Sequence, residues 1–223
     1  MNKPFIKILT GIVLLISTTI LVCNSANPEE PTGKEISVVL DPVFGGTETG
    51  AVGSYKLAEK EVVLDVALRV KDYIEKNNTG IKIYLTRTKD ESVSQKEREK
   101  FIQSHSSALV VGLRMNSSAK KDASGFSVRY DRKSKESKKL AEIISAEISD
   151  RFIKGLVPNE GIKPAEIYKN IQVSTVEVFL GYITNPNIEA NFRQPGVKEA
   201  FAESIGRAIA QYLDGGRDGK KNN

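Results

Sequence analysis

The sequence is poor in histidine and cysteine: its 223 residues include one of each, and it has no tryptophan. The single cysteine, Cys23, excludes a disulfide within the chain. The single histidine, His105, excludes every metal site that is built on two histidine ligands. Because His105 lies in the polar segment SHSS, we expect it at the surface rather than in a functional site.

Charge of one sign is also scarce, since the formal net charge is only +5. Part of this excess lies at the two ends of the chain, in Lys3, Lys7, Arg217, Lys220 and Lys221. The remaining body carries too little positive charge to indicate a nucleic-acid partner. An apolar content of 39% and a charged content of 27% are typical of a globular body, and the length suits one domain with an appendage.

Residues 1–23 are typical of a targeting segment, in which Lys3 and Lys7 precede an apolar run from Ile8 to Cys23. As a helix this run would span about 24 Å, somewhat short of a hydrocarbon core of about 30 Å. A signal peptide, a short retained membrane anchor and a lipoprotein signal all stay open. Residues 24–35 are predicted to form a polar tether, and the body that follows is expected to be exported to the cell envelope.

Cys23 ends the apolar run, which is where lipoproteins are acylated, so it is a candidate lipidation site. The preceding Ile20, Leu21 and Val22 fit this interpretation poorly, because a small residue is expected directly before an acylated cysteine. A cysteine that happens to end an apolar anchor is an equally good interpretation.

A glycine-rich loop follows the first apolar run of the body, in the segment VVLDPVFGGTETGAVG from Val38 to Gly53. Short apolar runs are typical of buried parallel strands, and α/β proteins place their ligand sites at the carboxyl ends of such strands. No Gly-Lys-Ser/Thr sequence follows the glycines, so the loop is not a phosphate-binding P-loop.

Apolar periodicity predicts alternating strands and helices along residues 36–213. The expected strands are 36–40, 81–85, 108–113, 125–130 and 176–183. The expected helices begin near residue 57 and cover 92–104, 134–152 and 197–213, and residues 214–223 are expected to form a flexible tail. Strands that alternate with amphipathic helices predict a three-layer α/β domain. The lysine-rich start of helix 134–152 is interpreted as a solvated face, with binding as the less favoured alternative.

Several short segments occur in an order that indicates a protein family more strongly than any one of them alone. They are DPVFGG (41–46), LAEKE (57–61), LTR (85–87) with Asp90, Arg98, VGLRMNS (111–117), GIK (161–163) and VFLGYITNP (178–186). Together they resemble the zinc-dependent N-acetylmuramoyl-L-alanine amidases, peptidoglycan hydrolases whose first strand ends in a DPGHGG-type loop. The resemblance implies a central mixed, mostly parallel sheet flanked by helices. Arg87 and Arg98 would then bridge neighbouring acids or contact substrate.

The chemistry implied by the resemblance does not carry over with the fold. The family holds zinc with two histidines and a glutamate, and these positions fall on Phe44, Glu59 and Arg114. The family's catalytic glutamate falls on Phe179. A phenyl ring has no lone pair and a guanidinium is a permanent cation, so only Glu59 could bind a metal. We therefore expect no zinc cofactor and no catalytic residue at these four positions.

The replacements suggest a local hypothesis: Arg114 takes the place of the ion and pairs with Glu59, while Phe44 and Phe179 fill the vacated volume. The alternative for Glu59 is an exposed acid in the first turn of a helix, stabilised by the helix dipole. Glu177 shares a strand face with Phe179 and is a weaker candidate to replace the lost glutamate.

Three functional hypotheses follow. The favoured one is a catalytically silent amidase-fold protein of the cell envelope that binds peptidoglycan or docks on an envelope protein such as an active hydrolase. The alternatives are an active amidase that cleaves the muramic acid–L-alanine bond through an unorthodox or partner-supplied site, and a purely structural envelope protein.

Overall fold

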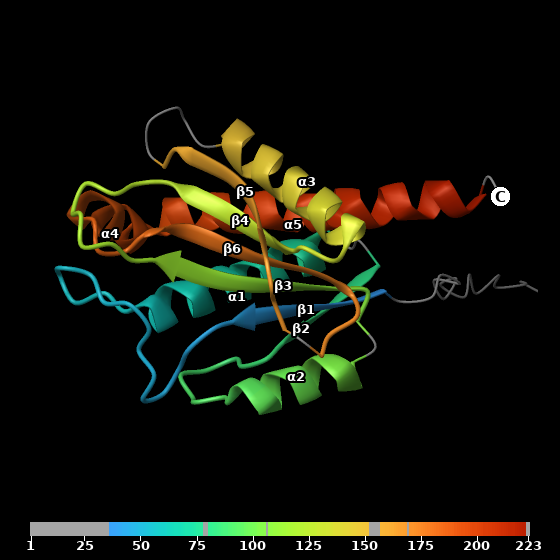
Figure 1. Ribbon diagram of the computed structural model, residues 1–223, viewed down its shortest axis with the longest axis horizontal. Coiled ribbons are helices and arrows are strands. Elements are labelled where there is room, and N and C mark those ends of the chain that lie inside the picture. Colours follow the sequence, from blue (N-terminus) through green and yellow to red (C-terminus); the bar gives the residue numbers. More distant parts are fainter. Residues whose placement is uncertain (1–35, 78–79, 106, 152–156, 169, 222–223) are drawn as a thin grey trace, which may run out of the picture. The chain divides into compact units, whose positions relative to one another are not determined.

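The computed structural model describes residues 36–77, 80–105, 107–151, 157–168 and 170–221. Six strands and five helices occur within these residues (Figure 1). In chain order they are β1 (Ile36–Pro42), α1 (Glu59–Lys76), β2 (Ile81–Leu85), α2 (Gln95–Ser104), β3 (Leu109–Asn116), β4 (Phe126–Asp131), α3 (Lys135–Arg151), β5 (Asn159–Ala165), β6 (Ser174–Tyr182), α4 (Pro186–Arg193) and α5 (Pro195–Lys221).

The strands form one mixed sheet in the order β2-β1-β3-β6-β4-β5. Neighbouring strands run parallel, except that β4 and β6 pair antiparallel. The prediction of a three-layer α/β domain with a mixed, mostly parallel sheet is confirmed. In Figure 1 the arrows of β1 and β3 point toward the end at which the β1–α1 loop and α4 lie.

Alternation along the strands sends side chains into two apolar clusters on opposite faces of the sheet. In β1, Val38 and Leu40 join the larger cluster, whereas Val39 joins the smaller one. Helices α1, α3 and α5 complete the larger cluster, and α2 contributes to the smaller one. A fully buried aliphatic side chain contributes about 1.5–3 kcal/mol, so the three-helix face provides most of the hydrophobic stabilisation.

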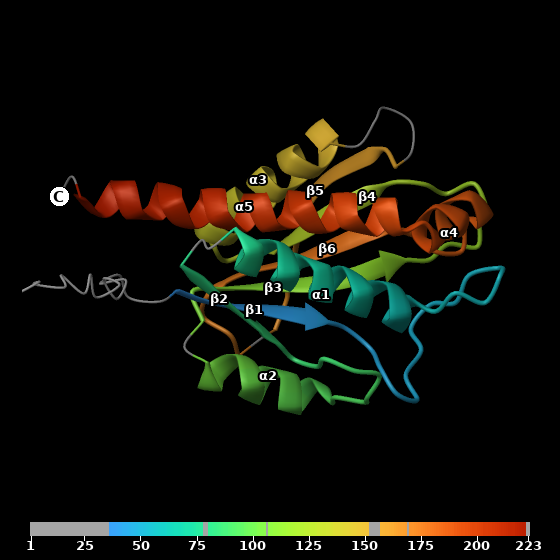
Figure 2. The ribbon, with the colours of Figure 1, turned by 180° about the vertical axis from the view of Figure 1, so that it is seen from behind.

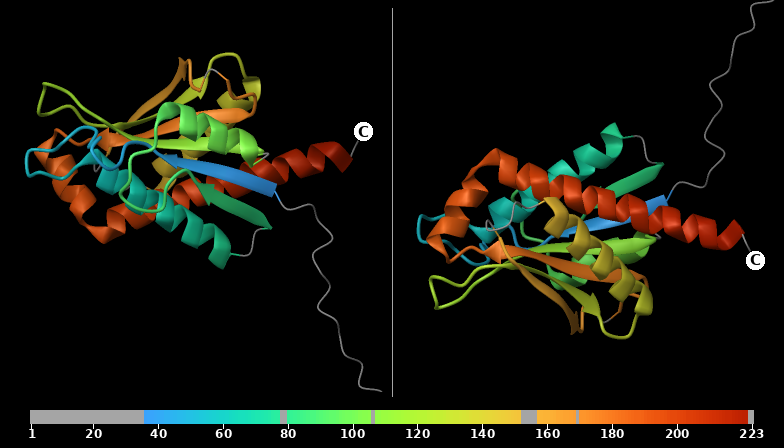
Figure 3. Two further views of the ribbon diagram at one scale, coloured as in Figure 1. Left: turned by 90° about the horizontal axis from the view of Figure 1, so that it is seen from below. Right: turned by 90° about the horizontal axis from the view of Figure 1, so that it is seen from above.

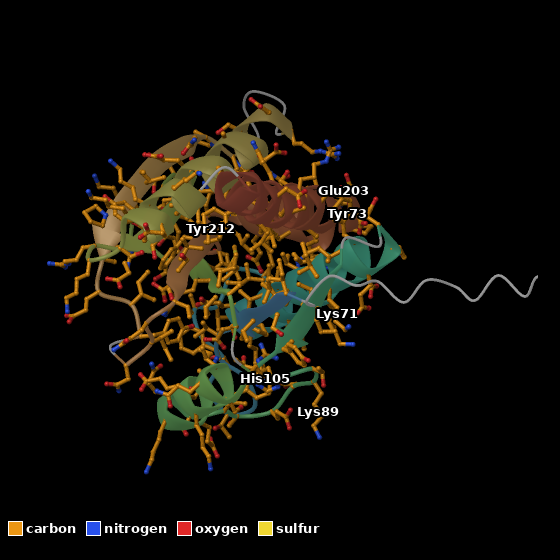
Figure 4. All side chains as sticks on the ribbon, turned by 90° about the vertical axis from the view of Figure 1, so that its right-hand side faces the viewer. Lys71, Tyr73, Lys89, His105, Glu203 and Tyr212 are labelled. Atoms are coloured by element: carbon orange, nitrogen blue, oxygen red, sulfur yellow. The ribbon has the colours of Figure 1, made fainter. Side chains whose placement is uncertain are left out.

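The layers can be followed in the other views. Figure 2 shows α1 and α5 in front of the sheet, as seen from behind. In the left panel of Figure 3, seen from below, α2 lies in front of the sheet. In the right panel, seen from above, α3 and α5 lie in front of it. The end-on view of Figure 4 places α2 and α5 on opposite sides of β1.

Two elements were not predicted from the sequence, and one helix is longer than expected. Strand β5 contains Gly161 and Pro164, which are tolerated here because the strand lies at the edge of the sheet. Helix α4 is short, and its signals are local: the side chain of Asn185 caps it and Pro186 opens it. Helix α5 continues to Lys221, so the expected tail is helical up to that residue.

The expected targeting segment 1–23, its candidate lipidation site Cys23 and the tether 24–35 lie outside the described residues. Across the residues that the structure does describe, no helix combines the length and the apolar character needed to cross a membrane.

Candidate functional site

The glycine-rich loop starts from a buried carboxylate at the end of β1. Asp41 is fully buried and accepts hydrogen bonds from the hydroxyls of Thr86 and Tyr168 and from Arg98 Nη1, the last at 2.7 Å. Arg98 is itself only 3% exposed, so the ion pair lies away from water. Burial, and then the Asp41 carboxylate, raise the pKa of Tyr168 well above its usual range, so the phenol keeps its proton. We call these four residues the Asp41 network.

A second set of contacts fixes the first part of the loop. Arg87 is 2% exposed and donates to the carbonyl oxygens of Pro42, Lys89 and Lys60 at 2.8–3.0 Å. Of the two arginines expected to bridge acids or contact substrate, Arg98 therefore bridges an acid, and Arg87 binds backbone carbonyls. Asp90 accepts from the N–H of Gly46 and from Lys60, both at 2.7 Å.

Glu189 of α4 anchors the far end of the loop. It is fully buried and accepts from the N–H groups of Tyr55 at 2.7 Å and Leu57 at 2.9 Å. Burial acts to raise its pKa, but these hydrogen bonds and Arg193 hold the pKa below the usual value. Gly53 must be glycine here, because a Cβ atom would lie 2.3 Å from the Glu189 carboxyl carbon.

The loop places Phe44 beside residues from β3 and β6. Arg114 and Phe179 are register partners on these neighbouring strands. The guanidinium carbon of Arg114 lies 5.3 Å from the ring centroid of Phe44 and 5.6 Å from that of Phe179, which is the geometry of two cation–π contacts. Phe44 has a φ of +66°, in the left-handed region that a residue with a side chain rarely adopts.

Glu59, the first residue of α1, lies near Arg114 but does not form the expected ion pair with it. Its Oε2 accepts from the N–H of Ala51 at 2.9 Å, and its Oε1 accepts from the N–H of Met115 at 2.8 Å. Its exposure is 3%, so the alternative of an exposed first-turn acid is wrong as well. Burial raises the pKa of Glu59 above 4.5, although both backbone hydrogen bonds and the charge of Arg114 oppose this rise.

The partner of Arg114 is Glu177, at a distance of 3.2 Å between Nη1 and Oε1. Glu177 therefore neutralises part of the Arg114 charge. On the other side of β6, the guanidinium carbon of Arg129 lies 4.2 Å from the Phe179 ring centroid. Sequence reasoning missed Arg129, although the alternation of Phe126, Val128 and Tyr130 already places it on the face opposite to theirs. We call Phe44, Arg114, Arg129, Glu177 and Phe179 the Arg114 cluster.

Comparison with known proteins identifies this architecture. The sequence profile described as N-acetylmuramoyl-L-alanine amidase matches residues 38–211. The chain belongs to the N-acetylmuramoyl-L-alanine amidase family. A similar relative is the germination-specific N-acetylmuramoyl-L-alanine amidase of Bacillus subtilis (strain 168), which is 26% identical over 190 residues, or 79% of each chain. Of other curated relatives, the chain spans only 22% to 63% of the length.

Solved structures of the amidase family agree with the fold. The N-acetylmuramoyl-L-alanine amidase AmiC2 of Nostoc punctiforme has a TM-score of 0.75 and 27% identity, over 81% of this chain and 98% of that chain. The CwlD amidase from Clostridioides difficile, solved in complex with the GerS lipoprotein, has a TM-score of 0.75 and 24% identity, over 80% and 98% of the two chains.

The residues present do not fit the zinc ion that the resemblance to this family implies. At the three positions assigned to ligands, Phe44 offers no lone pair, and Arg114 brings a positive charge between two rings. Both oxygens of Glu59 already accept hydrogen bonds from the backbone. Among the described residues, no group of three or more histidine, cysteine, aspartate or glutamate side chains could hold a metal ion.

His105 lies away from the amidase-family site. It follows α2 and precedes the amino end of β3, whereas Arg114 lies near the carboxyl end of that strand. Figure 4 shows it beside α2. Its ring packs between Tyr84 and Phe101, with centroids 4.4 and 4.0 Å away, and Nδ1 lies 2.7 Å from the carbonyl oxygen of Phe101.

Proposed function

We propose that this protein is a catalytically silent member of the amidase family that binds peptidoglycan. The observation that carries this proposal is the guanidinium of Arg114, in contact with the rings of Phe44 and Phe179 where the resemblance places the metal and the catalytic glutamate. A divalent cation would meet two phenyl rings, the fixed positive charge of Arg114 and two carboxylates that are already engaged, Glu59 with backbone N–H groups and Glu177 with Arg114. That combination repels the ion instead of coordinating it.

The consequence for amide hydrolysis is the loss of the nucleophile. A bound zinc ion would lower the pKa of water to about 7, which would supply hydroxide at neutral pH. The side chains of the Arg114 cluster provide no substitute, because its one carboxylate, Glu177, is paired with a cation. We therefore infer that the cluster lacks a means of activating water.

The surrounding scaffold supports a binding role over a purely structural one. The Asp41 network, Asp90 and Glu189 hold the loop in place at three points, and Arg98, Asp90 and Glu189 all come from later parts of the chain. A loop fixed in this way can present Phe44 and its neighbours to a ligand without first being ordered, which favours binding. We propose that the protein binds its ligand outside the cytoplasm, in the cell envelope, because one relative, from Staphylococcus epidermidis, is named "Probable cell wall amidase LytH".

Metal analysis and an amide-cleavage assay test the silent character. The purified chain should contain no stoichiometric zinc and should release no stem peptide from peptidoglycan. A double variant, Phe44→His with Arg114→His, should take up zinc with Glu59 yet cleave poorly, and addition of Phe179→Glu should produce cleavage. Histidine is better tolerated than phenylalanine at a positive φ, so the first change should not disturb the loop. Zinc and cleavage in the unmutated chain would refute the proposal.

Sedimentation with insoluble peptidoglycan tests the binding role. The chain should co-sediment with the polymer and be released by soluble muropeptide. A chain that stays in the supernatant would favour a purely structural protein.

Docking on an envelope protein is the second arm of the proposal. One observation favours it: the CwlD amidase, which shares this fold, was solved in complex with a lipoprotein. In this case the chain would change the activity of a hydrolase that is added to the same peptidoglycan assay. If the chain itself cleaved peptidoglycan only when a partner was present, it would instead be an active amidase with a partner-supplied site.

A further inference from the structure

The Arg114 cluster holds more positive than negative charge. Phe179 lies on β6, between β3 and β4 in the sheet, and it receives Arg114 from one neighbour and Arg129 from the other. Both guanidinium carbons lie within 5.6 Å of the ring centroid. Two cations that share one aromatic ring repel each other unless anions lie nearby.

The two carboxylates described beside Arg114 are already engaged, and Glu59 accepts hydrogen bonds from two backbone N–H groups. Arg129 is the register partner of Glu177, but the Glu177 carboxylate pairs with Arg114 instead. Within the described part of the chain, Arg129 forms no ion pair. Its register partner on β5, Lys163, is a further cation, which lies 3.4 Å from Glu160. The Nε atom of Arg114 is buried and has no hydrogen-bond partner among these residues.

These features make Arg129 a prepared anion receptor. Its contact with Phe179 limits the conformational freedom of a side chain that is otherwise costly to order. The side chain remains exposed, so its N–H donors are accessible to a ligand. A guanidinium presents two parallel N–H donors, which match the two oxygens of a carboxylate, and such charged pairs are the strong class of hydrogen bond.

We propose that Arg129, supported by the positive charge of Arg114, binds a free carboxylate of a peptidoglycan stem peptide. This inference rests on the proposed function, because it names the group of the ligand that the silent site recognises. In this arrangement the cluster attracts the peptide by charge at the position where a zinc enzyme would act on the amide bond.

Titration calorimetry with a soluble stem peptide tests the assignment. The probe is a peptide with free carboxylates, and its comparison is the same peptide with each carboxylate amidated. Amidation should weaken binding by about tenfold or more, because it removes the charged acceptor. Arg129→Gln should weaken binding of the free peptide to a similar extent, and Arg129→Lys should weaken it less because the charge is kept.

Arg207→Gln is the matched control. It removes the same charge from the exposed surface of α5, so its affinity should stay within about twofold of the unmutated chain if the effect is local. Equal affinity for the free and amidated peptides, or an unchanged affinity in Arg129→Gln, would overturn the proposal. Displacement of the peptide by inorganic phosphate at lower concentration than by acetate would also overturn it, since the receptor would then select phosphate.

These outcomes are separate from those that judge the silent character. Zinc content and amide cleavage do not depend on Arg129. Peptidoglycan binding that survives Arg129→Gln would leave the proposed function standing and would remove only the carboxylate receptor.

Discussion

Two buried carboxylates near the glycine-rich loop have opposite surroundings. Asp41 has the guanidinium of Arg98 at 2.7 Å and two hydroxyl donors, whereas Glu59 has only two backbone N–H groups. The charge of Asp41 is thus compensated where it lies. Burial raises the pKa of the Glu59 carboxyl group, since no cation among the described residues is paired with it. The carboxylate under the loop is therefore paired with a cation inside the protein, while the carboxylate of Glu59 is held by backbone N–H groups alone.

The largest expected effect comes from breaking the ion pair between Arg98 and Asp41. Arg98→Met would leave the Asp41 carboxylate buried without its cation, and removal of one partner of a buried pair costs about 3–5 kcal/mol. The free energy of unfolding in urea should fall by this amount. Arg207→Met, a control at an exposed arginine, should change it by less than about 0.5 kcal/mol. Equal effects of the two changes would show that the Asp41 network adds no stability.

A smaller loss is expected at Glu59. An amide side chain has one acceptor oxygen, so Glu59→Gln would leave the N–H of Ala51 or of Met115 without a partner, at a cost of about 1–3 kcal/mol in mildly acidic buffer. Urea unfolding at one fixed pH measures this loss. A gain in stability would mean that the buried carboxyl group is a net burden at every pH.

The loss at Glu59 should also depend on pH. An acid whose pKa is higher in the folded chain than in the unfolded chain holds its proton more tightly when folded. The stability that it contributes is therefore lost as the pH rises from its unfolded value, near 4.5, through the raised value. The difference in unfolding free energy between the unmutated chain and Glu59→Gln should shrink over this window. A difference that grows with pH would contradict the raised pKa.

The smallest effect is expected at Arg114. Its side chain is 30% exposed and that of Glu177 is 13% exposed, so water screens their ion pair in part. Arg114→Gln should cost about 1 kcal/mol, from the weakened pair and the lost cation–π contacts. Thermal unfolding measured beside Arg98→Met checks the order of the two arginines. A larger loss of stability in Arg114→Gln than in Arg98→Met would contradict this order.

Much of the fold could be predicted from the sequence because its strands are short apolar runs and its helices have one apolar face. The strands from Ile36 to Leu85 and from Leu109 to Tyr182 follow this rule, except for β5. Strand β5 contains glycine and proline and buries little, so it lacks any periodic signal. Its position is set by pairing with β4, which is a tertiary contact.

The position of the candidate site could be predicted from the sequence, but the contacts between its side chains could not. The resemblance brought Phe44, Glu59, Arg114 and Phe179 together, and the contacts of Arg114 with both rings agree with that. The expected ion pair of Arg114 with Glu59 was wrong, because the choice between two carboxylates depends on distances that spacing does not give. The backbone N–H groups that satisfy Glu59 have no signature in the side-chain sequence.

The edge formed by β5 has a consequence for how other molecules can approach the sheet. Pro164 has no amide hydrogen, and Gly161 has a φ of +82°, which departs from extended geometry. An incoming strand would find an interrupted ladder along β5, so this edge resists pairing with a strand of another molecule. A ligand at this edge would therefore contact side chains, among them Lys163 and the neighbouring Arg129, and not a regular row of backbone groups.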